Sequence, residues 1–108
     1  MNVIELAERR GELLRQAAAL ATKVRHLSRK RERLDAAFLL ERLDAPNAEL
    51  RKLQHIVLLE DRRLHDLSYD ELCQDLEDAE DELAKIKAEL DYITGLLSAH
   101  KALLRRED

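Results

Sequence analysis

Apolar residues recur at alternating steps of three and four in the last third of the chain, which is the spacing of one face of an α-helix. The stripe, in which only one residue is polar, comprises Tyr69, Leu72, Leu76, Ala79, Leu83, Ile86, Leu90, Ile93, Leu97, His100 and Leu104. Steps that average about 3.5 residues keep such a stripe on one partner helix, as in a left-handed coiled coil. We predict a helix over about residues 69–106, begun by Ser68 and Glu71 as a capping box.

A similar stripe predicts a second long helix at the start of the chain, over about residues 2–43. The stripe comprises Val3, Leu6, Arg10, Leu13, Ala17, Leu20, Val24, Leu27, Arg31, Leu34 and Phe38. Arg10 and Arg31 interrupt it. An arginine at such a position can lay its stem along the neighbouring helix and carry its charge to the edge. The alternative is that these arginines bind an anionic ligand.

Pro46 is the strongest helix breaker in the chain, and we predict that a shorter helix over about residues 46–66 follows it. Proline disfavours helical geometry at Ala45, and Asp44 can cap a new helix that has Pro46 in its first turn. One face of this helix carries Leu50, Leu53, Val57, Leu64 and Leu67, and it is widened by Ile56, Leu58 and Leu59. A face of this width predicts contact with two neighbours.

The composition supports a chain made only of helices. Two glycines and one proline in 108 residues supply too few turn positions for a β-sandwich or a phosphate-binding loop. With no tryptophan, two tyrosines and one phenylalanine, the interior must consist of aliphatic residues, which suits a narrow helical seam. We therefore predict an all-α fold, a long antiparallel coiled coil or three-helix bundle. Residues 1–108 should form a single domain that oligomerisation completes.

Charge favours one arrangement of the three helices. The net charge of -4 divides into +3 over residues 1–45, 0 over residues 46–67 and -7 over residues 68–108. In an up-down-up bundle the chain reverses near Pro46 and Leu67, and the last helix starts level with about residue 23 of the first. Its acidic start then faces the basic stretch of the first helix. In the alternative, the first two helices form one kinked rod. We favour the bundle because its opposite charges face each other.

The predicted helices differ in length, so the bundle leaves apolar seam uncovered at the start of the first helix and over residues 86–104. A row of leucines in water is an association site. We therefore expect a homodimer, or association with another protein, through this seam. Its residues are Leu83, Ile86, Leu90, Ile93, Leu97, His100 and Leu104 on the last helix and Leu6, Leu13 and Leu20 on the first. If His100 lies between two copies, its protonation would loosen the assembly.

A basic stretch on the first helix supports the main alternative, a dimeric helical regulator that contacts nucleic acid. Its residues are Lys23, Arg25, Arg29, Lys30 and Arg33, with Arg31 on the seam. Such a cluster can neutralise phosphates. No aromatic residues are interleaved for base stacking, and a paired acidic helix would screen the cluster. Nucleic acid is therefore the less favoured partner.

Catalytic and metal-binding patterns are missing from the sequence. No His-Glu-x-x-His or Cys-x-x-Cys pattern occurs, and Asp61 with His65 is expected to be a surface pair. The single cysteine, Cys73, cannot form a disulfide within the chain. In outline the chain is similar to the all-helical chorismate mutases, which collect basic residues around an anionic substrate, but no motif of that family matches. A small enzyme of this kind is the least favoured reading, and we expect no cofactor.

The first residues contain several glutamates and no apolar run, and nowhere do 18 apolar residues follow one another. We therefore expect a cytoplasmic protein with no membrane segment. Its predicted function is that of a non-enzymatic coiled-coil module for protein–protein interaction, as an adaptor, regulator or assembly factor.

Overall fold

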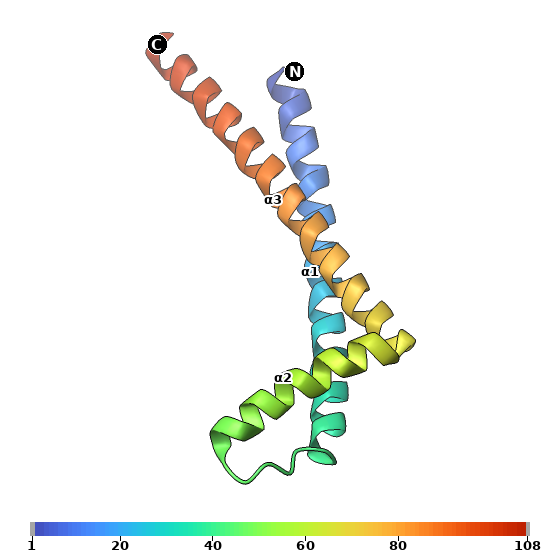
Figure 1. The fold of residues 1–108 in the computed structure, drawn as a ribbon. Helices are drawn as coiled ribbons and strands as arrows, with labels where there is room; N and C mark the ends of the chain where they lie inside the picture. Colours follow the sequence, from blue (N-terminus) through green and yellow to red (C-terminus); the bar gives the residue numbers. More distant parts are fainter. Residues whose placement is uncertain (1, 108) are drawn as a thin grey trace. The chain divides into compact units, whose positions relative to one another are not determined.

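The chain folds into three α-helices, as shown by a computed structural model that describes residues 2–107, with side chains up to residue 105 (Figure 1). The helices are α1 (Val3–Leu40), α2 (Ala48–His65) and α3 (Leu67–Glu107). Residues 2–107 contain no strand. The all-α prediction is confirmed.

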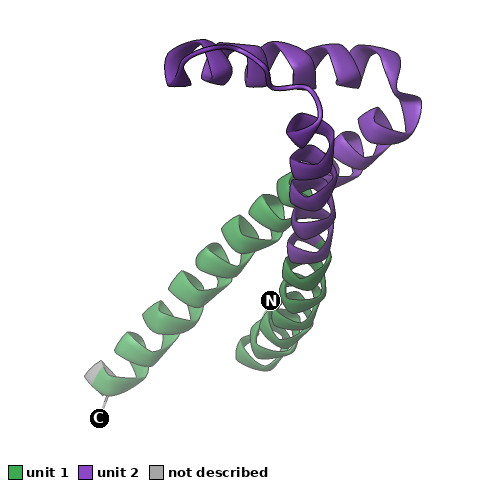
Figure 2. Ribbon diagram, turned by 90° about the horizontal axis from the view of Figure 1, so that it is seen from below, with its two compact units in different colours: residues 1–23, 79–108 green, residues 24–78 purple. Residues whose placement is uncertain are grey.

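The residues divide into two compact units (Figure 2). Unit 1 comprises residues 1–23 and 79–108, which are the first part of α1 and the later part of α3. Unit 2 comprises residues 24–78 and contains the end of α1, all of α2 and the start of α3. The single domain expected from the sequence stays a prediction.

Helix α1 has defined signals at both ends. The side-chain oxygen of Asn2 accepts a hydrogen bond from the N–H of Glu5 at 2.8 Å, which satisfies one of the free donors of the first turn. The helix ends at Leu40, earlier than the predicted boundary near residue 43. There the N–H groups of Arg42 and Leu43 both donate to the Leu39 carbonyl, at 3.1 and 2.9 Å, and the chain leaves the helix.

One side chain organises the loop between α1 and α2. Oε1 of Gln54 accepts hydrogen bonds from the N–H groups of Asp44 and Ala45, at 3.2 and 3.1 Å. Its Nε2 donates to the carbonyl of Arg42 at 3.2 Å and to the Asp44 carboxylate at 2.6 Å. Asp44 is therefore engaged by α2 from the side and is not its cap.

The N-cap of α2 is Asn47, whose side-chain oxygen accepts from the N–H of Leu50 at 2.9 Å. The predicted start at Pro46 with an Asp44 cap was wrong. Asn47 has extended backbone geometry, with φ of -134°, and its amide oxygen reaches the free donor that an N-cap must satisfy. The helix consequently begins at Ala48.

A single residue, Asp66, joins α2 to α3. Its N–H donates to the Arg62 carbonyl at 2.8 Å and closes α2. Its carboxylate accepts from the N–H of Tyr69 at 3.1 Å and opens α3. The predicted Ser68–Glu71 capping box was wrong because Asp66 already occupies the capping position.

The core of unit 1 is an apolar contact between antiparallel parts of α1 and α3. Leu6, Leu13, Ile86 and Ile93 form its buried cluster. Partly buried residues pack around them, namely Ala17, Leu20, Leu90, Leu96 and Leu97. The expectation that this seam is left uncovered in one chain was wrong, because the start of α1 covers it.

In unit 2, α2 packs against the end of α1. Arg62, near the end of α2, contacts residues 34–38 of α1, so α2 crosses the end of α1 instead of running back along it (Figure 1). Tyr69 in the first turn of α3 then lies close to Arg31 and Asp35. The predicted start of the last helix near residue 23 of the first was wrong. The buried apolar residues of this unit are Leu39, Tyr69, Leu72, Cys73 and Leu76.

Candidate protein-binding face

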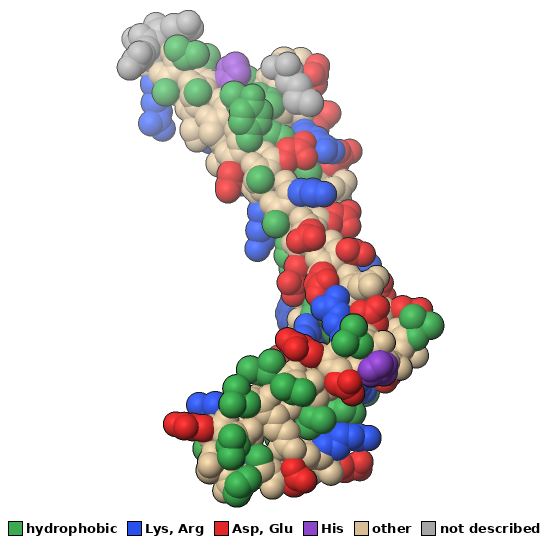
Figure 3. Space-filling view, viewed as in Figure 1, with side chains coloured by type: hydrophobic (Ala, Val, Ile, Leu, Met, Phe, Trp, Pro, Cys, Tyr) green, Lys and Arg blue, Asp and Glu red, His purple; other side chains and the backbone are tan. Residues whose placement is uncertain are grey.

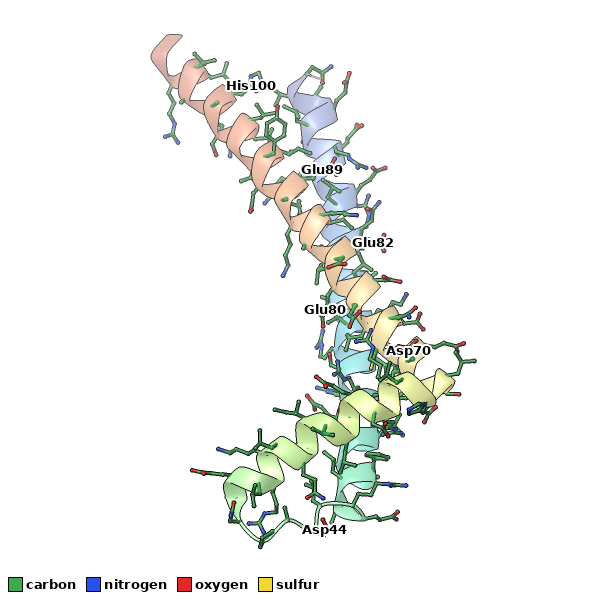
Figure 4. All side chains as sticks on the ribbon, in the orientation of Figure 1. Asp44, Asp70, Glu80, Glu82, Glu89 and His100 are labelled. Carbon is green, nitrogen blue, oxygen red and sulfur yellow. The ribbon has the colours of Figure 1, made fainter. Side chains whose placement is uncertain are left out.

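Most residues of the predicted association seam lie inside the chain. Leu6, Leu13, Ile86 and Ile93 are buried together, and Leu20, Leu90 and Leu97 pack against them. Leu83 and His100 are half-buried, and Leu104 is exposed. His100 lies on the part of α3 that is level with the start of α1 (Figure 4). The homodimer stays a prediction, but most of the seam that motivated it is covered within the chain, and Leu104 is its exposed member.

The exposed apolar side chains are concentrated on α2, which contains no buried residue. Figure 3 shows hydrophobic side chains gathered over this helix. We call this surface the α2 stripe; its residues and exposed fractions are Leu50 (46%), Leu53 (61%), Val57 (63%) and Leu64 (79%), with Ile56 (55%) at its edge. Leu67, which was predicted to lie on this face, instead begins α3 beyond the extended Asp66. A surface of contiguous apolar side chains on a helix is a candidate binding face.

The α2 stripe has the spacing of a coiled-coil seam. From Leu50 the positions run in steps of three, four, three and four to Leu64. One position in this series, between Val57 and Leu64, is occupied by Glu60. Glu60 is exposed, and it makes no ion pair with any described residue. The face is therefore apolar along its length with one central carboxylate.

The opposite side of α2 is held against α1 and α3 by Arg62. Its guanidinium lies between two aromatic rings, 4.6 Å from the centroid of Phe38 and 4.3 Å from that of Tyr69. It also donates a hydrogen bond to the Leu34 carbonyl at 3.2 Å. Cation–π contacts contribute most when the cation is desolvated, and the Arg62 side chain is only 13% exposed.

Arg63, the next residue, adds a second polar attachment. Its guanidinium donates two hydrogen bonds to the Glu77 carboxylate, at 2.6 and 3.0 Å, and one to Asp70 at 3.0 Å (Asp70 is labelled in Figure 4). These hydrogen bonds lower the pKa of Glu77. Together with Arg62, they fix the rotation of α2 about its axis, so the stripe faces outward.

Two polar oxygens are buried beside this attachment. Neither Oδ1 of Asp35 nor the Tyr69 hydroxyl makes a hydrogen bond. Burial, together with the neighbouring Asp35 carboxylate, raises the pKa of Tyr69 to about 12. Asp35 is compensated electrostatically by Arg62, at 4.0 Å, and by Arg31, at 3.8 Å. This group of charges is balanced within the chain.

The basic stretch is fully accessible. All five of its residues are exposed, namely Lys23, Arg25, Arg29, Lys30 and Arg33. None of them forms an ion pair with the acidic residues at the start of α3 in the described part of the chain, where Glu80 and Glu82 are labelled in Figure 4. Arg31, on the seam beside them, does act on that acidic start, because its charge helps the hydrogen bonds from Arg63 to lower the pKa of Glu77.

The other residues that the sequence offered for chemistry lie either on the surface or in the core. Asp61 and His65 lie 3.3 Å apart with both side chains exposed. Cys73 is fully buried, so its thiol cannot reach a second chain. Among the described residues there is no cluster of metal-ligating side chains. No helix in the described part of the chain has the length and apolarity needed to cross a membrane.

Comparisons with known proteins leave the chain without an assigned family. It matches no family model, no curated protein and no solved structure. The α2 stripe and the charges around it are therefore the features that bear on function.

Sequence reasoning missed the residues that orient this face. The sequence did not single out Arg62, because it is followed by another arginine, Arg63, and such a charged pair is typical of an exposed helix surface. The one available signal was that Phe38 and Tyr69 are two of only three aromatic residues in the chain. Scarce aromatic residues on separate helices are candidates for a shared contact.

Proposed function

We propose that the chain is a non-enzymatic module for protein–protein interaction, serving as an adaptor, regulator or assembly factor, and that it binds through the α2 stripe. The observation that carries this proposal is the exposure of the stripe along a helix that buries no residue of its own. Apolar residues at heptad spacing accept a second helix, whose side chains insert between them. The free energy of binding would come from covering leucines that now face water.

The polar groups that converge in unit 2 argue against the enzyme alternative. A pocket for an anionic substrate needs basic side chains with unused hydrogen-bonding capacity. Arg62 and Arg63 are instead engaged by Asp35, Asp66, Asp70 and Glu77 within the chain. Their positions support a structural role.

The cytoplasmic location belongs to the same proposal, because a buried free thiol suits a reducing compartment.

A direct test compares proteins captured from the native cell by the wild-type chain and by a stripe variant, Leu53→Asp with Val57→Asp. Both positions are exposed, so the variant should keep the helical circular dichroism of the wild type. We expect the wild type to retain a defined set of proteins, after nuclease treatment, that the variant loses.

The matched control is Leu14→Asp, which places the same charge on a leucine that is 45% exposed on α1, away from the stripe. It should retain the same proteins as the wild type. Capture of one set of proteins by all three chains would contradict the proposal.

A nucleic-acid regulator is the second candidate, because the five residues of the basic stretch are exposed and free of ion pairs with α3. Phosphate contacts need accessible cations of this kind. At about 0.15 M salt we expect little binding of duplex DNA, because the net charge is negative and the Debye length is about 8 Å. Sub-micromolar binding that disappears in Arg29→Glu with Arg33→Glu would make this the leading function.

A further inference from the structure

The α2 stripe contains one residue that a general apolar surface would not contain, and this residue restricts its partner. Glu60 occupies the central position of the heptad series, between Val57 and Leu64. It is exposed and makes no ion pair with a described residue, whereas the neighbouring Asp61 pairs with His65. A helix laid along the stripe would therefore cover a carboxylate that the chain itself leaves without a cation.

Two arginines closely follow Glu60 in the sequence, and both are engaged within the chain. Arg63 lines a shallow hollow with Glu60, Leu64 and Asp70, but its guanidinium is bonded to Asp70 and Glu77. A buried carboxylate is costly unless a cation and hydrogen bonds compensate it. The compensating charge must come from the bound helix.

A second copy of this chain would not supply that charge through its own stripe. In a parallel pair of α2 helices, Glu60 faces Glu60 of the other copy. In an antiparallel pair in which Leu53 faces Leu64, Glu60 faces Val57. Both registers cover the carboxylate without a cation.

A lipid surface fits the stripe poorly as well. Helices that lie on membranes carry lysine and arginine beside their apolar face, where these residues meet anionic headgroups. The α2 helix also carries the exposed cations Arg51 and Lys52, but Glu60 lies within the stripe itself. A membrane that covered the stripe would bury this carboxylate without a compensating cation.

We infer that the α2 stripe binds an amphipathic helix of another protein that is apolar at its seam positions and carries a lysine or arginine at the central one, against Glu60. This inference rests on the proposed function, since it names the partner of the same face. The central ion pair would select the partner and its register, as a single polar seam residue does in coiled coils.

The test uses two fluorescent synthetic helices of 21 residues with leucine at the seam positions, identical except for lysine or glutamate at the central one. Their binding is measured by fluorescence anisotropy with the wild-type chain, Glu60→Lys and Glu60→Gln. We expect the wild type to bind the lysine helix about tenfold more tightly than the glutamate helix. Glu60→Lys should reverse this preference, and Glu60→Gln should nearly abolish it.

Glu49→Lys is the matched control, because it makes the same change of charge at the end of the helix instead of the centre of the stripe. It should retain the preference of the wild type. Equal binding of the two synthetic helices would overturn the inference while leaving the proposed function intact. Binding of neither helix, or binding that persists in Leu53→Asp with Val57→Asp, would contradict both.

Two further measurements decide between this partner and its competitors. Sedimentation equilibrium at micromolar concentration should show no dimer that depends on the stripe. A dimer abolished by Leu53→Asp would overturn the inference in favour of a second copy. Flotation with vesicles of phosphatidylcholine and phosphatidylserine should leave the chain unbound, and stripe-dependent flotation would overturn the inference in favour of a membrane.

Discussion

Unit 1 and unit 2 use their apolar residues in opposite ways. In unit 1, Leu6 and Leu13 of α1 meet Ile86 and Ile93 of α3, and all four are buried. In unit 2, α2 turns the leucines of the stripe outward, while its other side has half-buried Leu58 and Leu59 and is attached by Arg62 and Arg63. The chain therefore has one region in which heptads hold it together and another in which a heptad face remains free.

The energetic difference between the two attachments follows from their chemistry. Burying a leucine or isoleucine side chain contributes roughly 1.5–3 kcal/mol, whereas an exposed ion pair contributes about 0–1 kcal/mol. The two ring contacts of Arg62 add about 0.5–2 kcal/mol each. We infer that the seam of unit 1 stabilises the fold more than the attachment of α2 does. A binding face is thus carried by the less strongly held helix.

The largest effect is expected from a substitution in the buried cluster of unit 1, compared with the same substitution at an exposed leucine beside it. Leu13 is fully buried, and Leu13→Ala should lower the free energy of unfolding by about 2–5 kcal/mol, because it removes apolar contacts and leaves a cavity. The adjacent Leu14 is 45% exposed, and Leu14→Ala should cost less than about 1 kcal/mol. Urea denaturation followed by circular dichroism measures both. Equal losses would show that α1 does not pack in this orientation.

A smaller effect tests the attachment of α2. Arg62→Met removes both ring contacts and the hydrogen bond to Leu34, and it leaves Asp35 with less compensation, so we expect a loss of about 1–3 kcal/mol. Arg51→Met, an exposed arginine on the same helix, is the matched control and should change stability little.

Hydrogen exchange can show where the Arg62→Met loss falls. Backbone amides of α2 should exchange faster in this variant, while amides around Leu13 and Ile93 in unit 1 should keep their protection. Uniformly faster exchange along the chain would mean that the two regions do not differ in the way proposed.

The smallest effect concerns pH. Hydrogen bonds from Arg63 lower the pKa of Glu77 below its ordinary 4.5, so this pair stabilises the fold above that pH. The contribution is lost as the pH falls through the lower, folded-state value. The free energy of unfolding should therefore decline less steeply from about pH 5 to pH 3 in Glu77→Gln than in the wild type. Glu71→Gln, at an exposed site with no ion pair, should behave like the wild type.

The heptad pattern predicted the helices well because the same residues that repeat along α1 and α3 are the ones that become buried. It could not predict which heptads pair, since Leu6 and Leu13 match several parts of α3 equally well. Nor could it predict that α2 crosses the end of α1 within unit 2, where Arg62 lies between Phe38 and Tyr69. Contacts between distant single residues leave no periodic signal.

The candidate face illustrates the same limit. The apolar residues of α2 were visible in the sequence, and two faces were expected to be covered. Periodicity alone could not tell that Leu58 and Leu59 would be half-buried and that Leu53 and Val57 would face water. Both pairs of residues are apolar, and the polar contacts of Arg62 and Arg63 determine which pair faces the rest of unit 2. The predicted helix caps were wrong for a related reason. Several residues near each helix start could serve as the cap, and three-dimensional contacts that the sequence does not show select Asn47 and Asp66.

The binding face and its anchor share one uninterrupted helix, which gives α2 an unusual mutational tolerance. Each residue advances an α-helix by about 100° because a turn contains 3.6 residues. Loss or gain of one codon between Val57 and Leu64 would rotate the first half of the stripe away from the second half. Substitutions on the outward face leave the fold untouched, whereas a change of length divides the face. Evolution can therefore vary the outward residues of α2 without disturbing the fold, but not the number of residues between its two halves.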